Sequence, residues 1–204
     1  MTVLETKNEQ SILEAARKTF LIKGFDGTST QEIAEEAGTT KSMVNYYFRS
    51  KERLFAKVFR QEFKNLFASI GEVLGAKMHL KAKIERIVAL DLDHLISIPE
   101  LPVFIMSELH RNPELLLKEV EQIPIKSMIL KLEKDIIHEV NIGTIRYIAP
   151  IELMINIQSL TIYPILAKPM LIHKLGLSEK VFGRMMEKRK IDIVEFIWNG
   201  IKIK

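Results

Sequence analysis

The sequence predicts an all-α fold, and three observations carry that prediction. Nearly every segment repeats its apolar residues three and four positions apart, as one face of a helix does. No segment shows the strict alternation of a half-buried strand. Gly and Pro residues mark the breaks between the periodic segments. With 204 residues, the chain is long enough to bury one sizeable core or two small ones.

The first quarter of the chain predicts three helices. Residues 9–23 place apolar side chains on one face, and Gly24 ends that helix as a C-cap. The stretch DGTST at 26–30 is a turn with a capping residue, and TQEIAEEAG at 30–38 is a short helix that Gly38 stops. TKSMVNYYF at 40–48 is the third helix.

A long fourth helix follows Ser50, which supplies a fresh N-cap. Its apolar stripe is spaced by threes and fours and consists of Phe55, Phe59, Phe63, Leu66, Ile70 and Val73. No Pro or Gly interrupts this helix before Gly71. Two domains in this chain would therefore share one rigid helix.

Further helices are predicted at about 80–97, 101–111, 113–140, 147–167 and 178–201. The breaks fall at Pro99, Pro102, Pro113, Gly143 with Pro150, and the stretch KPMLIHKLGLS at 168–178. Pro124 is expected to kink the helix at 113–140, because a proline inside a helix removes a backbone donor and clashes with the preceding turn.

Composition excludes several classes of protein. The chain has no Cys, which excludes disulfides, thiolate metal sites and thiol nucleophiles. Its five His form no metal-spaced cluster, and Asp91, Asp93 and His94 are interpreted as a solvated helix face. With no Glu-x-x-His pair on two helices, no nucleophile motif and no Gly-rich phosphate loop, we expect neither a cofactor nor an enzymatic activity. The uncharged run at 153–167 is too short to span a membrane, and no signal peptide precedes the first helix, so we expect a cytoplasmic protein.

The net charge of +4 is unevenly spread. Residues 25–37 carry four acidic side chains and no cation, whereas residues 38–60 carry six cations and only one acid, Glu52. The six cations are Lys41, Arg49, Lys51, Arg53, Lys57 and Arg60. Positive charge on the third helix and the start of the fourth suits a DNA groove, because neutralised phosphates release counterions. A solvated helix face is the alternative interpretation of the same cluster.

The spacing of apolar residues fits a helix-turn-helix. Ala34 and Ala37 allow close crossing, and Gly38 permits a tight turn. Burial of Val44 and Phe48 would turn the polar side chains of the third helix away from the core. Among those, an Asn can pair with adenine, a Lys can reach guanine, and a Tyr hydroxyl can donate to a phosphate.

The stretch ILEAARKTFLIKGFDGTSTQEIAEEAGTTKSMVNYYFRSKERLF resembles the DNA-binding region of the TetR family of bacterial transcriptional regulators, over residues 9–55. The positions that carry the resemblance are Ala15-Ala16, Phe20, Gly24, Thr28 to Thr30, Ile33-Ala34, Ala37-Gly38, Lys41, Tyr46, Phe48, Lys51 and Leu54. By position, the family's DNA contacts fall on Thr30, Thr39, Thr40, Lys41, Ser42, Asn45, Tyr46, Tyr47 and Lys51. Three of these depart from the commonest pattern, since Ser42 stands in place of Gly, Asn45 in place of Tyr and Tyr47 in place of His.

The resemblance implies a DNA-binding domain at 1–52, with the helix-turn-helix at about 29–48, and a helical ligand-binding and dimerisation domain at 53–204. It also implies a homodimer that binds a palindromic operator in double-stranded DNA, joined through helices 147–167 and 178–201. Helix 147–167 is apolar on most sides and needs cover on more than one face, although the core of a monomer would also supply it. A helical adaptor protein without sequence-specific DNA binding is the alternative function.

A repressor of this kind would be released from DNA by a small molecule, whose identity the sequence leaves unknown. The apolar and imidazole side chains expected at the ligand are Phe59, Phe63, Phe67, His94, Phe104, Met106, His110, Met128 and Leu132. Met side chains adapt to varied apolar ligands, but each of these residues would serve equally in an ordinary core.

Overall fold

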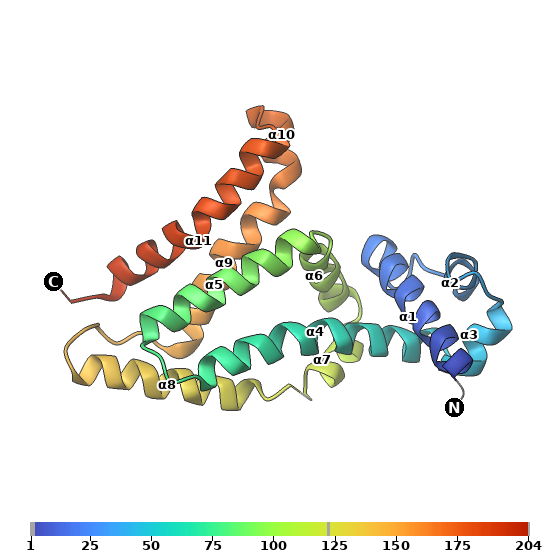
Figure 1. Cartoon of the computed structure of the whole chain (residues 1–204), viewed down its shortest axis with the longest axis horizontal. Helices are drawn as coiled ribbons and strands as arrows, with labels where there is room; N and C mark the ends of the chain where they lie inside the picture. Colours follow the sequence, from blue (N-terminus) through green and yellow to red (C-terminus); the bar gives the residue numbers. More distant parts are fainter. Residues whose placement is uncertain (1–2, 122, 204) are drawn as a thin grey trace. The chain divides into compact units, whose positions relative to one another are not determined.

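A computed structural model describes residues 3–121 and 123–203, and over these ranges it is built from helices (Figure 1). The expected all-α class is confirmed. Within the described ranges, the strand-like feature is a single antiparallel bridge between Ile145 and Lys202. The helices are α1 (Val3–Lys23), α2 (Thr30–Glu36), α3 (Lys41–Phe48), α4 (Lys51–Gly75), α5 (Leu80–Ser97), α6 (Leu101–Arg111), α7 (Pro113–Val120), α8 (Ile125–Asn141), α9 (Pro150–Leu166), α10 (Lys168–Leu175) and α11 (Glu179–Ile201).

The helices pack as two compact units. The described part of the N-terminal unit lies within residues 1–65 and 103–123, and that of the C-terminal unit within 66–102 and 124–204. Helix α4 therefore contributes to both units, while α6 and α7 pack with the N-terminal unit although they follow α5 in the chain. The expected functional division into 1–52 and 53–204 stays a prediction.

The core of the N-terminal unit is built around aromatic rings. Phe20 of α1 meets Phe55 of α4 edge to face, with ring centroids 5.1 Å apart. Phe104 of α6 lies 5.6 Å from the ring of Phe55 and 6.2 Å from that of Phe59. Aromatic pairs at these separations add specific geometry to the burial of apolar area. Helix α6 is thereby anchored to the same core as α1.

The C-terminal unit is centred on α5, which packs against α8, α9 and α11. Ile84, Val88 and Leu92 of α5 are buried in its core. Lys83 is also buried, and its ammonium donates to the carbonyl of Leu74 at 3.0 Å and to Asp135 at 2.7 Å. A buried cation with both a carboxylate and a carbonyl acceptor is compatible with the core.

The structure corrects three details of the expected helices. The helix expected at 113–140 is two helices, α7 and α8, so the expected kink at Pro124 is wrong. Pro124 is instead the N-cap of α8, at the point where its missing N–H needs no helical partner. Helix α9 begins at Pro150 rather than at 147. The stretch 168–178, expected as a break, contains α10, which ends at Gly176.

Across the described ranges, every helix is too short or too polar to cross a bilayer.

Candidate DNA-binding surface

Helix α2 starts with a complete capping box. The backbone N–H of Glu32 donates to Ser29 Oγ at 3.2 Å, and the backbone N–H of Ser29 donates to Glu32 Oε2 at 2.8 Å. Two N–H groups at the start of the helix are thus satisfied by side chains. The ammonium of Lys23 lies 2.7 Å from Glu32 and, with the N–H of Ser29, lowers the pKa of that carboxyl to about 2.

A tight turn connects α2 to α3. Gly38 has a φ of 65°, in the left-handed region where glycine is favoured. The N–H of Thr39 reaches back to the carbonyl of Ala34 at 2.9 Å and closes the end of α2. Thr40 is the N-cap of α3, and its hydroxyl accepts from the N–H of Met43 at 3.3 Å. These short-range contacts fix where α3 begins.

Helix α3 turns its apolar side inward and its polar side outward. Val44 and Phe48 are buried, as expected from their spacing. Four side chains of α3 are exposed, namely Lys41, Ser42, Asn45 and Tyr46. They supply donors and acceptors of the kinds that meet base edges and phosphates.

The remaining residues of the expected DNA contact set lie around α3. Thr30 is the first residue of α2, and Tyr47 is half-buried, with its ring centroid 5.2 Å from that of Tyr46 in an edge-to-face arrangement. Lys51 is the first residue of α4, and its ammonium donates to two backbone carbonyls, those of Phe25 and Thr28, at 3.0 Å each. The structure thus places all nine residues in the N-terminal unit, and their contact with DNA stays a prediction.

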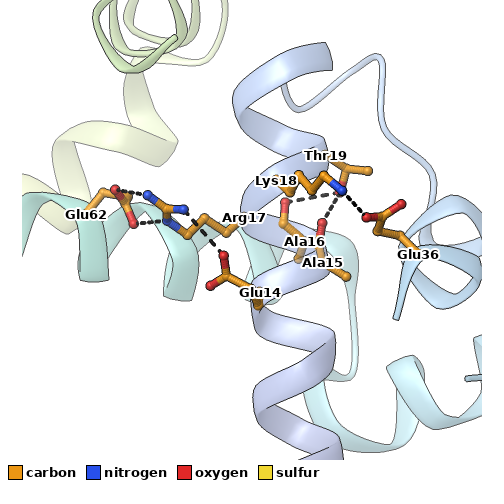
Figure 2. A network of polar contacts seen from close by, with 8 residues as sticks. All are labelled: Glu14, Ala15, Ala16, Arg17, Lys18, Thr19, Glu36 and Glu62. Atoms are coloured by element: carbon orange, nitrogen blue, oxygen red, sulfur yellow. Dashed lines mark hydrogen bonds and ion pairs between the residues drawn. The ribbon is translucent and has the colours of Figure 1, made fainter. Parts of the chain in front are cut away.

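In this region two acidic side chains form ion pairs with α1, while several cations stay exposed. Lys23 pairs with Glu32, and Lys18 pairs with Glu36, as Figure 2 shows for the second pair. The acidic side chains of α2 are in this way partly neutralised within the protein. On the other side of the turn Lys41 is exposed, and so are Arg49 and Arg53. The exposed positive charge therefore gathers at α3 and the start of α4, where an anionic partner would be attracted.

A family model for bacterial regulatory proteins of the tetR family matches residues 12–58, the stretch that holds α2, α3 and the start of α4. Over these residues the chain matches the TetR family. The expected resemblance is confirmed for the part of the chain that the model covers.

Curated relatives are matched over part of their length. The HTH-type transcriptional regulator RutR of Escherichia coli K12 is 37% identical over 87 residues, which are 38% of this chain and 40% of RutR. The HTH-type transcriptional repressor NicS of Pseudomonas putida KT2440 is 31% identical over 112 residues, 52% of this chain and 50% of NicS. The chain thus spans two fifths of RutR and half of NicS. Both names are those of transcriptional regulators, and neither is that of an enzyme.

The fold of the whole chain also resembles that of solved structures. A TetR family transcription regulator from Marinobacter aquaeolei VT8 superposes with a TM-score of 0.68 and 15% identity, and the match covers 100% of both chains. At this identity the likeness shows a shared fold.

The residues expected at a ligand are divided between the two units of the chain. Phe59, Phe63, Phe104, Met106 and His110 belong to the N-terminal unit, and Phe67, His94, Met128 and Leu132 belong to the C-terminal unit. Some lie in the core of their unit, since Phe59, Phe104 and Leu132 are buried. Met106, by contrast, is 51% exposed. Their role in binding a ligand stays a prediction.

In the described part of the chain four acids, Glu62, Asp91, Glu108 and Glu139, are buried, and the sequence analysis predicted none of these burials. Asp91 was interpreted as part of a solvated face, which is wrong, because it is 2% exposed and accepts hydrogen bonds from Gln158 and Thr161. Glu108 of α6 is fully buried in the N-terminal unit. No local pattern marks Asp91 or Glu108 as buried, since Gln158 lies 67 positions from Asp91 and Phe25 lies 83 positions from Glu108. Among the described residues, no three His, Asp or Glu side chains are placed to hold a metal ion together.

Proposed function

We propose that this protein is a transcriptional regulator that binds duplex DNA through α3. The observation that carries the proposal is the orientation of this helix, with Val44 and Phe48 buried while Lys41, Asn45 and Tyr46 are exposed. The helix lies in the stretch that matches the TetR family model. The names of RutR and NicS, both helix-turn-helix regulators, support the same proposal. A regulator of chromosomal DNA would act in the cytoplasm, which is part of the proposal.

Within this proposal the side chains divide into two groups. Asn45 and Lys41 would meet base edges, because an Asn can bond adenine at two points and a Lys can bond the acceptors of guanine. Tyr46, Tyr47 and the threonines at the helix starts would bond phosphates. Lys51 would also reach a phosphate. Two of its three N–H groups donate to loop carbonyls, which leaves the third for a phosphate oxygen.

The regulator would act as a homodimer on a palindromic site. Support comes from large apolar side chains that α9 and α11 leave exposed, including Ile151 (54%), Ile155 (52%), Tyr163 (62%) and Phe196 (71%). Exposed apolar side chains that gather on neighbouring helices indicate a surface covered by another molecule. A two-fold dimer would present two copies of α3 to major grooves roughly 34–36 Å apart, one helical turn of DNA.

The regulator would be a repressor that a small apolar molecule releases from DNA. NicS carries the name of a repressor, which supports the direction of the effect. Helix α4 supports the coupling, because it starts at Lys51 beside the DNA-binding helices and continues without Pro to Gly75. A change at one end of a rigid helix would move the other.

Selection of bound duplexes from a random pool, with the full-length protein, tests the proposal. A palindromic consensus whose binding weakens steeply with salt is expected, because phosphate contacts release counterions. The variant Lys41→Ala should lose this binding, while Lys126→Ala, an exposed lysine of α8 in the C-terminal unit, should keep it. A helical adaptor protein would select no sequence and show no salt-dependent binding.

A further inference from the structure

A buried carboxylate of α6 holds the loop that leads into the DNA-binding helices. Glu108 is 0% exposed, and its Oε1 accepts a hydrogen bond from the backbone N–H of Phe25 at 2.8 Å. Its Oε2 accepts from the side-chain amide of Asn112 at 2.9 Å. A carboxylate is costly to bury unless donors meet it, and Phe25 supplies one from the loop between α1 and α2. An apolar residue at this position could not bind this N–H.

Phe25 is also held by a cation, through its backbone carbonyl and its ring. Lys51 of α4 donates to the carbonyl of Phe25 at 3.0 Å, and its ammonium lies 4.2 Å from the centroid of the Phe25 ring. The ring itself meets Phe55 edge to face at 5.0 Å. One loop residue thus joins an acid from α6, a base from α4 and the aromatic core. Charged partners make these hydrogen bonds stronger than neutral ones.

The backbone of the loop is shaped around the carboxylate. Gly24 has a φ of 71°, and a Cβ placed on it would lie 2.8 Å from Oε1 of Glu108. Side-chain Cβ atoms almost never approach another heavy atom within 3.0 Å, so a side chain here would displace the Glu108 carboxylate, besides adopting a backbone conformation that favours glycine. Thr28 closes the loop, because its hydroxyl donates to the carbonyl of Gly24 at 2.8 Å.

We infer that Glu108 is a positioning residue of the DNA-binding surface, acting through Phe25 and Lys51. It fixes the loop from which α2 starts, and with it the orientation of α3 and of the Lys51 ammonium. The functional DNA-binding unit then includes α6, a helix that lies 83 residues further along the chain from the loop it holds. The inference rests on the proposed function, since it assigns a role in presenting α3 to DNA.

Three full-length variants separate positioning from mere stability. Glu108→Ala removes the acceptor, whereas Glu108→Gln keeps a carbonyl for the N–H of Phe25 and lets Asn112 turn its own oxygen to the new amide. Met106→Ala changes an exposed side chain of the same helix and is the matched control. Amide exchange of residues 24–28 in the free protein and affinity for a selected duplex are measured well below the melting temperature of each variant.

Loss of a charge-assisted hydrogen bond should speed exchange of the Phe25 amide about tenfold or more in Glu108→Ala. Affinity for the selected duplex should fall roughly tenfold, and Glu108→Gln should restore most of both. Should Glu108→Ala fail to fold, Gly24→Ala tests the same contact, because its methyl group would displace the carboxylate and reduce the affinity similarly.

Two results would overturn the inference alone. In one, Glu108→Ala exchanges at residues 24–28 no faster than Met106→Ala. In the other, the loop exchanges faster while the duplex is bound as tightly as by the wild-type protein. A wild-type protein that binds no duplex at all would instead overturn the proposed function, and the inference with it.

Discussion

Arg17 of α1 and Glu62 of α4 are joined by two parallel hydrogen bonds. Nε of Arg17 donates to Oε1 of Glu62 at 2.5 Å, and Nη2 donates to Oε2 at 3.3 Å (Figure 2). Glu62 is 5% exposed, so the pair lies mostly away from water. The hydrogen bonds from Arg17 to Glu62 raise the pKa of the guanidinium above its usual value. The pair ties the first helix to the helix that follows α3.

Arg17→Ala should destabilise the protein by about 3 kcal/mol, because it leaves the Glu62 carboxylate buried without its cation. Glu14→Ala is the matched control, since Glu14 is exposed and touches the same guanidinium at 3.5 Å. An exposed pair of this kind contributes less than about 1 kcal/mol. Urea unfolding of both variants measures the difference, and equal midpoints would show that the Arg17–Glu62 pair adds nothing.

The local parts of the candidate site were predictable from sequence because their causes lie within a few residues. Gly38 at the turn follows from its place after a short helical segment, and Val44 and Phe48 follow from their spacing of four. The structure has the turn and the two buried side chains where they were expected. The sequence pattern therefore correctly predicted which face of α3 is polar.

The contacts that hold this region to the rest of its unit were not predictable. Glu62 meets Arg17 across 45 positions, and Glu108 meets Phe25 across 83. Periodicity places both acids on helices but says nothing of which helix packs beside them, and acids are usually exposed. The same reason explains why the packing of α6 with the N-terminal unit could not be expected from the sequence.

Asn45→Ala should weaken binding to the selected duplex by roughly 1–3 kcal/mol and relax the preference at one base position. Asn45 is exposed on α3, where no burial would be lost with its side chain. Tyr46→Phe is the comparison, because loss of a hydroxyl that donates to phosphate should weaken all duplexes alike. If Asn45→Ala weakens random and selected duplexes equally, the base-reading role of Asn45 is wrong.

Lys51→Ala should lower the salt dependence of binding by about one phosphate contact, a change close to one unit in the slope of log K against log salt. The third N–H of Lys51 is the donor that would make this contact. Because the side chain also holds the carbonyls of Phe25 and Thr28, affinity should fall further than the slope alone explains. An unchanged slope would show that Lys51 makes no phosphate contact and only holds the loop.

Phe196→Glu should convert the proposed dimer into monomers, because it replaces an apolar side chain that is 71% exposed on α11 with a charged one. Covering such surface is the main favourable term in most association, and a buried unpaired carboxylate would oppose it. Ile137→Glu on α8, at a site 45% exposed in the same unit, is the control and should leave the assembly unchanged. Sedimentation at micromolar concentration distinguishes the two. A wild-type protein that sediments as a monomer would contradict the proposed dimer.

Asp91→Asn should stabilise the protein at neutral pH and have little effect near pH 4. Burial raises the pKa of Asp91 to about 6, against the hydrogen bonds from Thr161 and Gln158 that lower it. In the unfolded chain an Asp has a pKa near 3.9, so between about pH 4 and pH 6 the folded state holds a proton that the unfolded state has lost. The stability contributed by this proton is present below about pH 4 and is lost as the pH rises through about 6. The free energy of unfolding falls by at most about 3 kcal/mol, because the pKa in the folded state lies roughly 2 above that in the unfolded chain.

The asparagine carries no charge at any pH and still offers an oxygen to Gln158 and Thr161, so it removes the penalty without removing the acceptor. Asp93→Asn is the matched control, because Asp93 is exposed on the same helix and pairs with Lys190 at 2.6 Å. Urea unfolding from pH 4 to pH 8 should show the gap between Asp91→Asn and the wild-type protein opening across this range, while Asp93→Asn shows no such gain. A gap that stays constant with pH would mean that Asp91 does not titrate between the two states, and its burial would then need another cation or donor to explain it.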